Sequence, residues 1–240
     1  MNETYKVQVQ DLVDDLKAVF THAGLGGEAG EYKLLTQSFL YKFLNDKFLY
    51  QAKVLDESNT YENLLAMGED DYDWLLEDIG TSTAWLKPEQ LIETLHRQQN
   101  EATFYESFEN TLNQIAIDNN DIFSVHTDGD TAIRLFDERL VTDTISDSSK
   151  RNEVAKAIIN LLARVKFDET IFSQGFDFFS TLFEYMIKDY NKDGGGKYAE
   201  YYTPHSVAKI IADILVGDDK PSNVRIYDPS AGSGTLLMNL

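Results

Sequence analysis

The stretch that decides the fold is Asp228–Leu237, DPSAGSGTLL, which follows a short apolar run at Asn223–Tyr227. In that run Val224 and Ile226 alternate with more polar residues, which predicts a β-strand. A strand that ends in Asp-Pro and a turn of small residues is typical of a doubly wound sheet, which presents its backbone to a nucleotide-like ligand. The turn is not a P-loop, because no G-K-[ST] follows, and it lacks the full three-glycine dinucleotide fingerprint.

A second informative block, Gly196–Pro204 (GKYAEYYTP), lies just before a predicted helix. Apolar residues recur at helical spacing up to Leu215, so we expect this helix to pack against something flat. Thr203 suits its N-cap, and the proline that follows suits its first turn. The aromatic residues before Thr203 would then lie near free backbone N–H groups that can meet a ligand. On this segment alone, an ordinary capped helix with two buried tyrosines is the alternative.

Together these two blocks resemble the modification (methyltransferase) subunit of type I restriction–modification systems. These subunits are adenine-N6 DNA methyltransferases of the gamma class. The family places an aromatic-Thr-Pro motif before a D-P-x-x-G-[ST]-G motif, and it precedes both with a helical domain of roughly this length. The sharp resemblance covers about residues 196–240.

The resemblance implies S-adenosylmethionine as the cofactor, and it implies no metal site. Asp228 would accept a hydrogen bond from the methionine ammonium, directly or through water, and the glycine-bearing turn would pass beneath the cofactor. His205 could act as a base, although a surface histidine is the alternative. The residues that the resemblance assigns to the cofactor site are Glu200, Tyr201, Tyr202, Thr203, Pro204, His205, Asp228, Ser230, Ala231, Gly232, Ser233, Gly234 and Thr235.

Two parts of the family pattern are missing from these 240 residues. No acidic residue follows a second strand to hold the ribose hydroxyls, and there is no Asn-Pro-Pro-aromatic motif. In the family that motif accepts hydrogen bonds from the adenine amine and stacks on the flipped base. We therefore assign no catalytic residue, and we expect these residues to be the N-terminal part of a longer subunit and inactive alone.

The rest of the chain predicts a mainly helical domain at residues 1–170, followed at 171–240 by the start of a doubly wound, Rossmann-like α/β domain. Glycines at 24–30 separate the first two helices, and residues 118–150 read as short helices joined by loops. Pro88 suits the first residue of a helix, and Asn191–Gly196, NKDGGG, reads as a mobile hinge. Apolar residues at helical spacing predict helices near residues 13–20, 31–53, 88–95, 103–117, 155–165 and 176–190.

Charge is distributed unevenly along the chain. Residues 1–150 hold 29 acidic and 11 basic side chains, whereas residues 151–240 hold 12 and 10. Because an acidic surface repels phosphate, the first part should not grip nucleic acid unaided. This fits the partners that the resemblance implies, namely a specificity subunit, a second modification subunit, in some systems a restriction subunit, and double-stranded DNA in the assembled complex.

Composition also keeps open a second hypothesis, which is a non-catalytic acidic interaction module or DNA mimic that docks on a restriction complex. A solvated acidic face is the plain alternative for the charge itself. The chain has no cysteine, no run of eighteen apolar residues and no secretory signal at its start, so we expect a cytoplasmic protein without a membrane span. The acidic cluster Glu69–Asp73 does not have the spacing of a calcium loop.

Overall fold

The computed structural model describes residues 3–81, 83–123, 125–126, 132–167, 171–172, 185, 203, 205–217, 225–231 and 236–237. The chain divides into two compact units, Met1–Phe176 and Asp177–Leu240. Each unit is described by itself below. None of the helices in the described ranges is long and apolar enough to cross a membrane.

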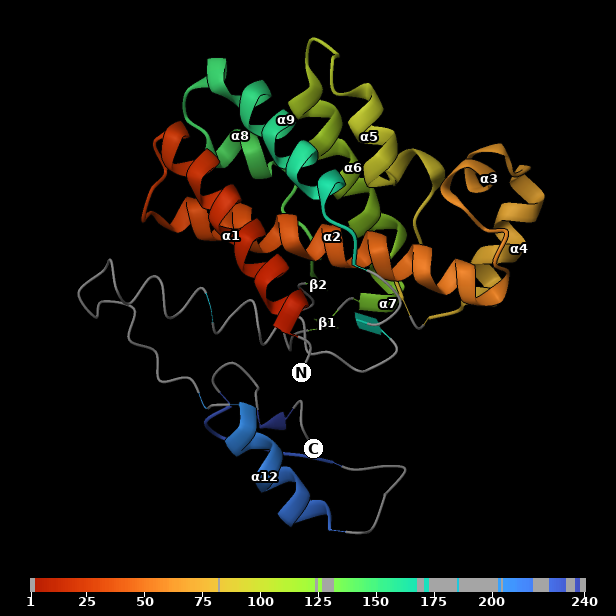
Figure 1. Ribbon diagram of the computed structural model, residues 1–240, viewed down its shortest axis with the longest axis vertical. Helices are drawn as coiled ribbons and strands as arrows, with labels where there is room; N and C mark the ends of the chain where they lie inside the picture. Colours follow the sequence, from red (N-terminus) through yellow and green to blue (C-terminus); the bar gives the residue numbers. More distant parts are fainter. Residues whose placement is uncertain are drawn as a thin grey trace. The chain divides into compact units, whose positions relative to one another are not determined.

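The described part of the first unit is mainly helical, as the sequence predicts. Its elements, in chain order, are α1 (Glu3–Ala23), α2 (Ala29–Leu55), α3 (Tyr61–Ala66), α4 (Glu69–Ile79), the 3₁₀ turn η1 (Pro88–Gln90), α5 (Ile92–Gln98), α6 (Phe104–Asp118), α7 (Asn120–Phe123), β1 (Val125–His126), β2 (Ala132–Ile133), α8 (Leu140–Thr144) and α9 (Ser148–Arg164). Helix α9 packs against α1, α5 and α6, while α2 contacts α1, α4 and α8 (Figure 1).

The core of this unit comes from the apolar faces that give the helices their periodicity. On α2 the buried face includes Leu34, Phe39 and Phe48, and the rings of Tyr41 on α2 and Phe108 on α6 pack in a T-shaped arrangement with centroids 6.2 Å apart. Burying such side chains is the main force that holds short helices together in water. The other fully buried side chains of this core include Leu12, Leu16, Phe20, Leu35, Phe104, Leu112, Ile158, Ile159 and Leu162.

Three local predictions differ from the structure. Gly30 lies in the first turn of α2 and not in the breaker before it; a Cβ there would come within 2.7 Å of Thr144 Cγ2 on α8. Pro88 begins a 3₁₀ turn, because Leu91 adopts extended dihedrals and separates that turn from α5. Between α7 and α8 the sequence predicts only helices and loops, but β1 and β2 pair there as an antiparallel hairpin.

In the second unit the predicted helix is present as α12 (His205–Val216). Its apolar stripe is exposed, since Ile210 and Ile214 are 58% and 74% accessible, and the buried side chains among those described on α12 are Ala208 and Ala212. Arg225–Tyr227, the described part of the predicted strand, is not a β-strand. A strand forms only when a neighbour accepts its ladder hydrogen bonds, and no described segment pairs with this one. The predicted helix near 176–190 lies outside the described residues, Tyr185 excepted, and so does the hinge at 191–196.

Candidate functional site

The D-P-S-A turn at Asp228–Ala231 is the described core of the predicted cofactor site. Pro229 and Ser230 form a turn, and the backbone N–H of Ser230 donates a hydrogen bond of 2.8 Å to Asp228 Oδ1. This is the local bond by which an aspartate side chain organises the backbone two residues later. Asp228 and Ala231 are half-buried, whereas Ser230 is exposed. The turn therefore holds one carboxylate in a set direction and leaves backbone accessible beside it.

The aromatic-Thr-Pro block is described only at Thr203 and from His205 onward. Thr203 is half-buried, and α12 begins at His205, two residues further on. The first N–H groups of a helix have no partner within it and carry partial positive charge. A ligand with acceptor atoms can therefore bind at this end of α12. The structure does not describe the side chain of His205, so its predicted role as a base stays a hypothesis.

The other predicted site residues lie outside the described part of the chain. They are Glu200, Tyr201, Tyr202, Pro204, Gly232, Ser233, Gly234 and Thr235. The structure thus brings Asp228, Ser230 and Ala231 together in one turn and leaves the arrangement of the rest as a prediction. Among the described residues there is no group of three or more His, Asp or Glu side chains that could hold a metal ion.

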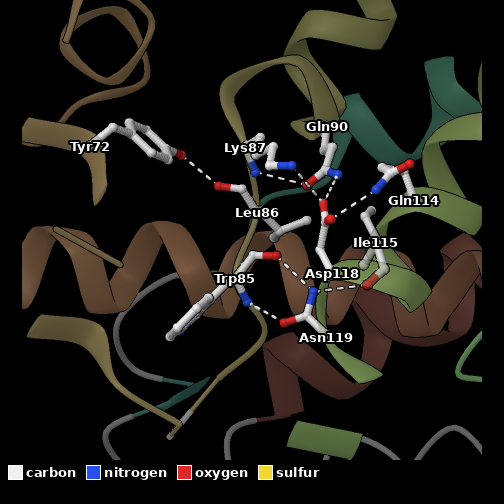
Figure 2. A network of polar contacts seen from close by, with 9 residues as sticks. All are labelled: Tyr72, Trp85, Leu86, Lys87, Gln90, Gln114, Ile115, Asp118 and Asn119. Carbon is white, nitrogen blue, oxygen red and sulfur yellow. Dashed lines mark hydrogen bonds and ion pairs between the residues drawn. The ribbon is translucent and has the colours of Figure 1, made fainter. Parts of the chain in front are cut away.

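A polar network in the first unit, not anticipated from the sequence, joins the C-terminal end of α6 to the segment before α5 (Figure 2). Asp118 accepts hydrogen bonds from Gln90 Nε2 (2.9 Å) and Gln114 Nε2 (2.8 Å), and its carboxylate lies 3.2 Å from Lys87 Nζ. Burial by itself raises the pKa of Asp118, but these three donors outweigh it and hold the pKa below its usual range. Asp118 is thus ionised in the folded protein near neutral pH.

Asn119 is the next member of this network, and it is almost fully buried. Its Oδ1 accepts from the backbone N–H of Trp85 (2.6 Å), and its Nδ2 donates to the carbonyls of Trp85 (2.8 Å) and Ile115 (2.9 Å). The Tyr72 hydroxyl of α4 donates to the carbonyl of Leu86 (2.6 Å) (Figure 2). Because each of these polar groups has its partner, the network fixes a loop, and the arrangement is structural.

A second buried polar cluster lies on α2, where Lys42 and Asp46 form an ion pair of 2.8 Å. Asp46 also accepts from Asn45 Nδ2 (2.8 Å) and from the backbone N–H of Phe167 (2.9 Å). Burial lowers the pKa of Lys42, and the nearby Asp46 carboxylate opposes this shift. The bond to Phe167 ties the segment after α9 to α2, so the cluster positions the chain where it leaves α9.

This cluster borders an open groove of about 1280 Å³ between α2, α3, α5 and the end of α9. The charged side chains that line it are Lys42, Asp46, Lys53, Glu57, Glu62, Glu93 and Lys166. Acidic groups outnumber basic ones, so the groove does not offer the positive potential that phosphate backbones require.

Residues 174–240 match the model of the N-6 DNA Methylase family. Over 248 aligned residues the chain is 25% identical to the type I restriction enzyme MpnII methylase subunit of Mycoplasma pneumoniae, covering 97% of this chain and 43% of the relative. Its fold is similar to the crystal structure of a type I restriction–modification methyltransferase subunit from Streptococcus thermophilus, with a TM-score of 0.64 and 21% identity. That match covers 98% of this chain and 49% of the other.

These similarities confirm the resemblance that the two motifs indicate, which is to the methyltransferase subunits of type I restriction–modification systems. The chain spans less than half the length of the relatives that it matches.

Proposed function

We propose that this chain is the N-terminal portion of a type I modification subunit, and that the intact subunit transfers methyl from S-adenosylmethionine to the N6 amine of adenine in a specific DNA sequence. The observation that carries the proposal is the D-P-S-A turn at Asp228–Ala231, inside the segment that matches the N-6 DNA Methylase family. The doubly wound cofactor domain would begin within residues 171–240, and residues 1–170 would form the helical domain before it, together with Ile171 and Phe172, which pack on that domain.

The chemistry of the turn at Asp228 fits S-adenosylmethionine. The Asp228 carboxylate is held by Ser230 N–H and is half-buried, so it can accept a hydrogen bond from the cofactor's ammonium group. The small residues that follow it in the sequence, with Gly232 and Gly234 among them, would leave room for a ligand to lie on the backbone. Thr203 and the residues next to it at the start of α12 would flank the same ligand. When bound, the cofactor supplies a methyl group on a positively charged sulfur.

The DNA-related steps belong, in this proposal, to the assembled complex. A specificity subunit would read the sequence, a second modification subunit would complete the enzyme, and in some systems a restriction subunit would join it. The acidity of residues 1–150 supports the assignment of DNA binding to other subunits, because an acidic surface repels DNA unless a basic partner lies between the two. A cytoplasmic location follows from the same proposal. The 240 residues contain no Asn-Pro-Pro-aromatic sequence, so by themselves they should not methylate DNA.

Calorimetric titration of the longer subunit with S-adenosylmethionine tests the cofactor site. Gly234→Val should abolish binding, because a β-branched side chain fills the space beneath the ligand. Asp228→Ala should weaken it about ten- to a hundredfold, the loss expected for a hydrogen bond to a charged group. Asp143→Ala, the same change at an exposed aspartate of α8, is the control. If Gly234→Val stays folded and binds like the parent, this turn is not the cofactor site.

Transfer itself is tested with labelled cofactor and genomic DNA, using the intact subunit together with its specificity subunit. Adenine-N6 methylation is expected. Methylation at cytosine, or none at all with a folded complex that binds the cofactor, would contradict the proposed reaction while leaving the cofactor site intact. An interaction module or DNA mimic would bind neither cofactor nor DNA.

A further inference from the structure

We propose that the outer face of α4 is a docking surface for a basic protein segment, with an arginine of that segment stacked on Trp74. Trp74 is 67% exposed, more than any other large apolar side chain in the described part of the helical unit. Tryptophan is enriched among the few side chains that carry most of the binding energy at protein interfaces. This inference uses no part of the cofactor site and does not depend on the proposed function.

The position of Trp74 on the helix explains its exposure. The buried side of α4 consists of Tyr72, Leu75, Leu76 and Ile79. Trp74 is two residues from Tyr72, which at 3.6 residues per turn places it on the opposite side. Its neighbours on that side are the residues three and four positions away. These four residues are all acidic and all exposed, and together with Trp74 they are called the Trp74 face: Asp70, Asp71, Glu77 and Asp78.

Helix stability accounts for only two of the four charges of the Trp74 face. Asp70 and Asp71 lie in the first turn, where the helix dipole favours negative charge. Glu77 and Asp78 lie in the last turn, where the dipole disfavours it, and that turn has no basic residue. No ion pair in the described part of the chain includes any of the four carboxylates. A cation from outside the unit would relieve this unfavourable arrangement.

The underside of α4 is held in place, so a partner would meet a preformed surface. The Tyr72 ring lies 6.5 Å from the Phe48 ring of α2, and its hydroxyl bonds to the Leu86 carbonyl (Figure 2). At the end of α4, Trp85 Nε1 donates to the carbonyl of Gly80 (2.7 Å). Asn119 in turn fixes both backbone polar groups of Trp85. Because the backbone of α4 is already fixed, binding costs little conformational entropy there, and this favours affinity.

Charge and ring chemistry together select the occupant. An arginine guanidinium stacks on an aromatic ring and can also pair with carboxylates, whereas a lysine ammonium is a compact point charge. The chain contains this arrangement elsewhere: the Arg97 guanidinium lies 4.8 Å from the centre of the Tyr61 ring and pairs with Glu62 and Glu93. A nucleic acid is disfavoured by the four carboxylates, and a second copy by the net charge of −20.

The test titrates the 240-residue chain with a short arginine-rich peptide, followed by calorimetry and by tryptophan fluorescence. The Trp74→Phe variant assigns the fluorescence signal, because Trp85 is the other tryptophan. Trp74→Ala should weaken binding about tenfold, the size expected for a desolvated cation–ring contact. The peptide with lysine in place of arginine should bind several-fold more weakly than its arginine counterpart.

A matched pair of variants separates a site from general attraction between opposite charges. Glu77→Gln/Asp78→Asn removes two negative charges from the Trp74 face and should weaken binding at least severalfold. Glu138→Gln/Asp143→Asn removes two exposed charges elsewhere on the unit and should change it little. Equal losses in both double variants, equal affinity for the two peptides, or no binding would overturn the proposal. So would association of the chain with itself, or binding of double-stranded DNA, that disappears in Trp74→Ala.

Discussion

The Lys42 ammonium lies 2.8 Å from the Asp46 carboxylate one helical turn further along α2, and both side chains are almost completely buried. Asp46 has three donors, since Asn45 and the backbone N–H of Phe167 bond to it as well. Lys42 has, besides Asp46, the face of the Phe167 ring 5.5 Å away. The carboxylate is therefore better satisfied than the ammonium, and the two partners should respond differently to removal.

Asp46→Ala should lower the free energy of unfolding by about 3–5 kcal/mol, because it leaves a buried ammonium uncompensated. Lys42→Met should cost less, since Asp46 keeps its two N–H donors. Urea unfolding followed by circular dichroism measures both. Asp143→Ala, which breaks an exposed pair with Arg139, should cost about 1 kcal/mol or less. A larger loss for Lys42→Met than for Asp46→Ala would contradict this account.

The helical unit should fold alone, and it should need the residues just beyond position 170. Phe172 stacks on Tyr50 of α2 with ring centroids 5.3 Å apart and lies 5.7 Å from Phe43, and Ile171 is buried. A chain that ends at residue 176 should give a helical far-ultraviolet spectrum. A chain that ends at residue 170 should have an unfolding free energy lower than that of the 176-residue chain by about 2 kcal/mol or more, the value of one buried apolar side chain. A coil or β spectrum, or equal stability of the two chains, would refute this.

Alkaline pH should destabilise the protein through Tyr72. Burial, and to a lesser degree the charge of Glu89, raises the pKa of Tyr72 well above its usual value near 10. Above pH 10 the unfolded chain therefore loses this proton while the folded chain keeps it, so the unfolding free energy falls as pH rises. At pH 7 the Tyr72→Phe variant should be less stable than the parent by about 1 kcal/mol, the loss of one hydrogen bond.

Between pH 10 and pH 11 the difference in unfolding free energy between the parent and Tyr72→Phe should shrink, because the phenylalanine variant has no proton to lose at this position. Urea unfolding at several pH values measures it. The control is Tyr227→Phe, which removes a hydroxyl from a ring that is 87% exposed and should change the free energy of unfolding little at pH 7. A constant difference between Tyr72→Phe and the parent up to pH 11 would contradict the raised pKa.

Asn119→Ala should cost about 1–3 kcal/mol, because it leaves the N–H and carbonyl of Trp85 without their partners. In a Trp74→Phe background Trp85 is the only tryptophan. Its fluorescence emission should shift to longer wavelength as the loop becomes more exposed to water. Asn113→Ala, on α6 itself and with an exposed bond to Arg134, is the control and should change neither quantity appreciably. An unshifted spectrum with unchanged stability would show that the network does not hold the loop.

Much of the helical unit could be predicted from the periodicity of its apolar residues. The helices α1, α2, α6 and α9 all bury the stripes that the sequence displays, because a stripe of this spacing forms one face only in a helix. The β1–β2 hairpin was missed because two-residue strands are too short to show a period. Gly30 read as a helix breaker, but what requires glycine there is the approach of Thr144 from α8, which local sequence does not reveal.

The turn at Asp228–Ala231 could be predicted from sequence because its signal is local, whereas its use as a cofactor site stays a prediction. The conformation of an Asp-Pro turn depends on residues next to each other in the sequence, and the hydrogen bond from the Ser230 N–H to Asp228 spans only two positions. The same locality explains why the family resemblance could be recognised from short motifs. The exposed stripe of α12 shows the limit of this reasoning, since periodicity identifies an apolar face but not the surface that covers it.

The sequence by itself thus determined the helical periodicities, the acidic character of the first 150 residues and the motifs of the second unit, all of which depend on neighbours along the chain. Only the tertiary structure decided which polar residues would be buried together. Asp46 meets Phe167, and Asn119 meets Trp85, across separations of 121 and 34 positions. Because a buried polar group must find a partner wherever the fold supplies one, such pairs leave no pattern in sequence spacing. The exposure of Trp74 was likewise decided by which side of α4 packs on its neighbours.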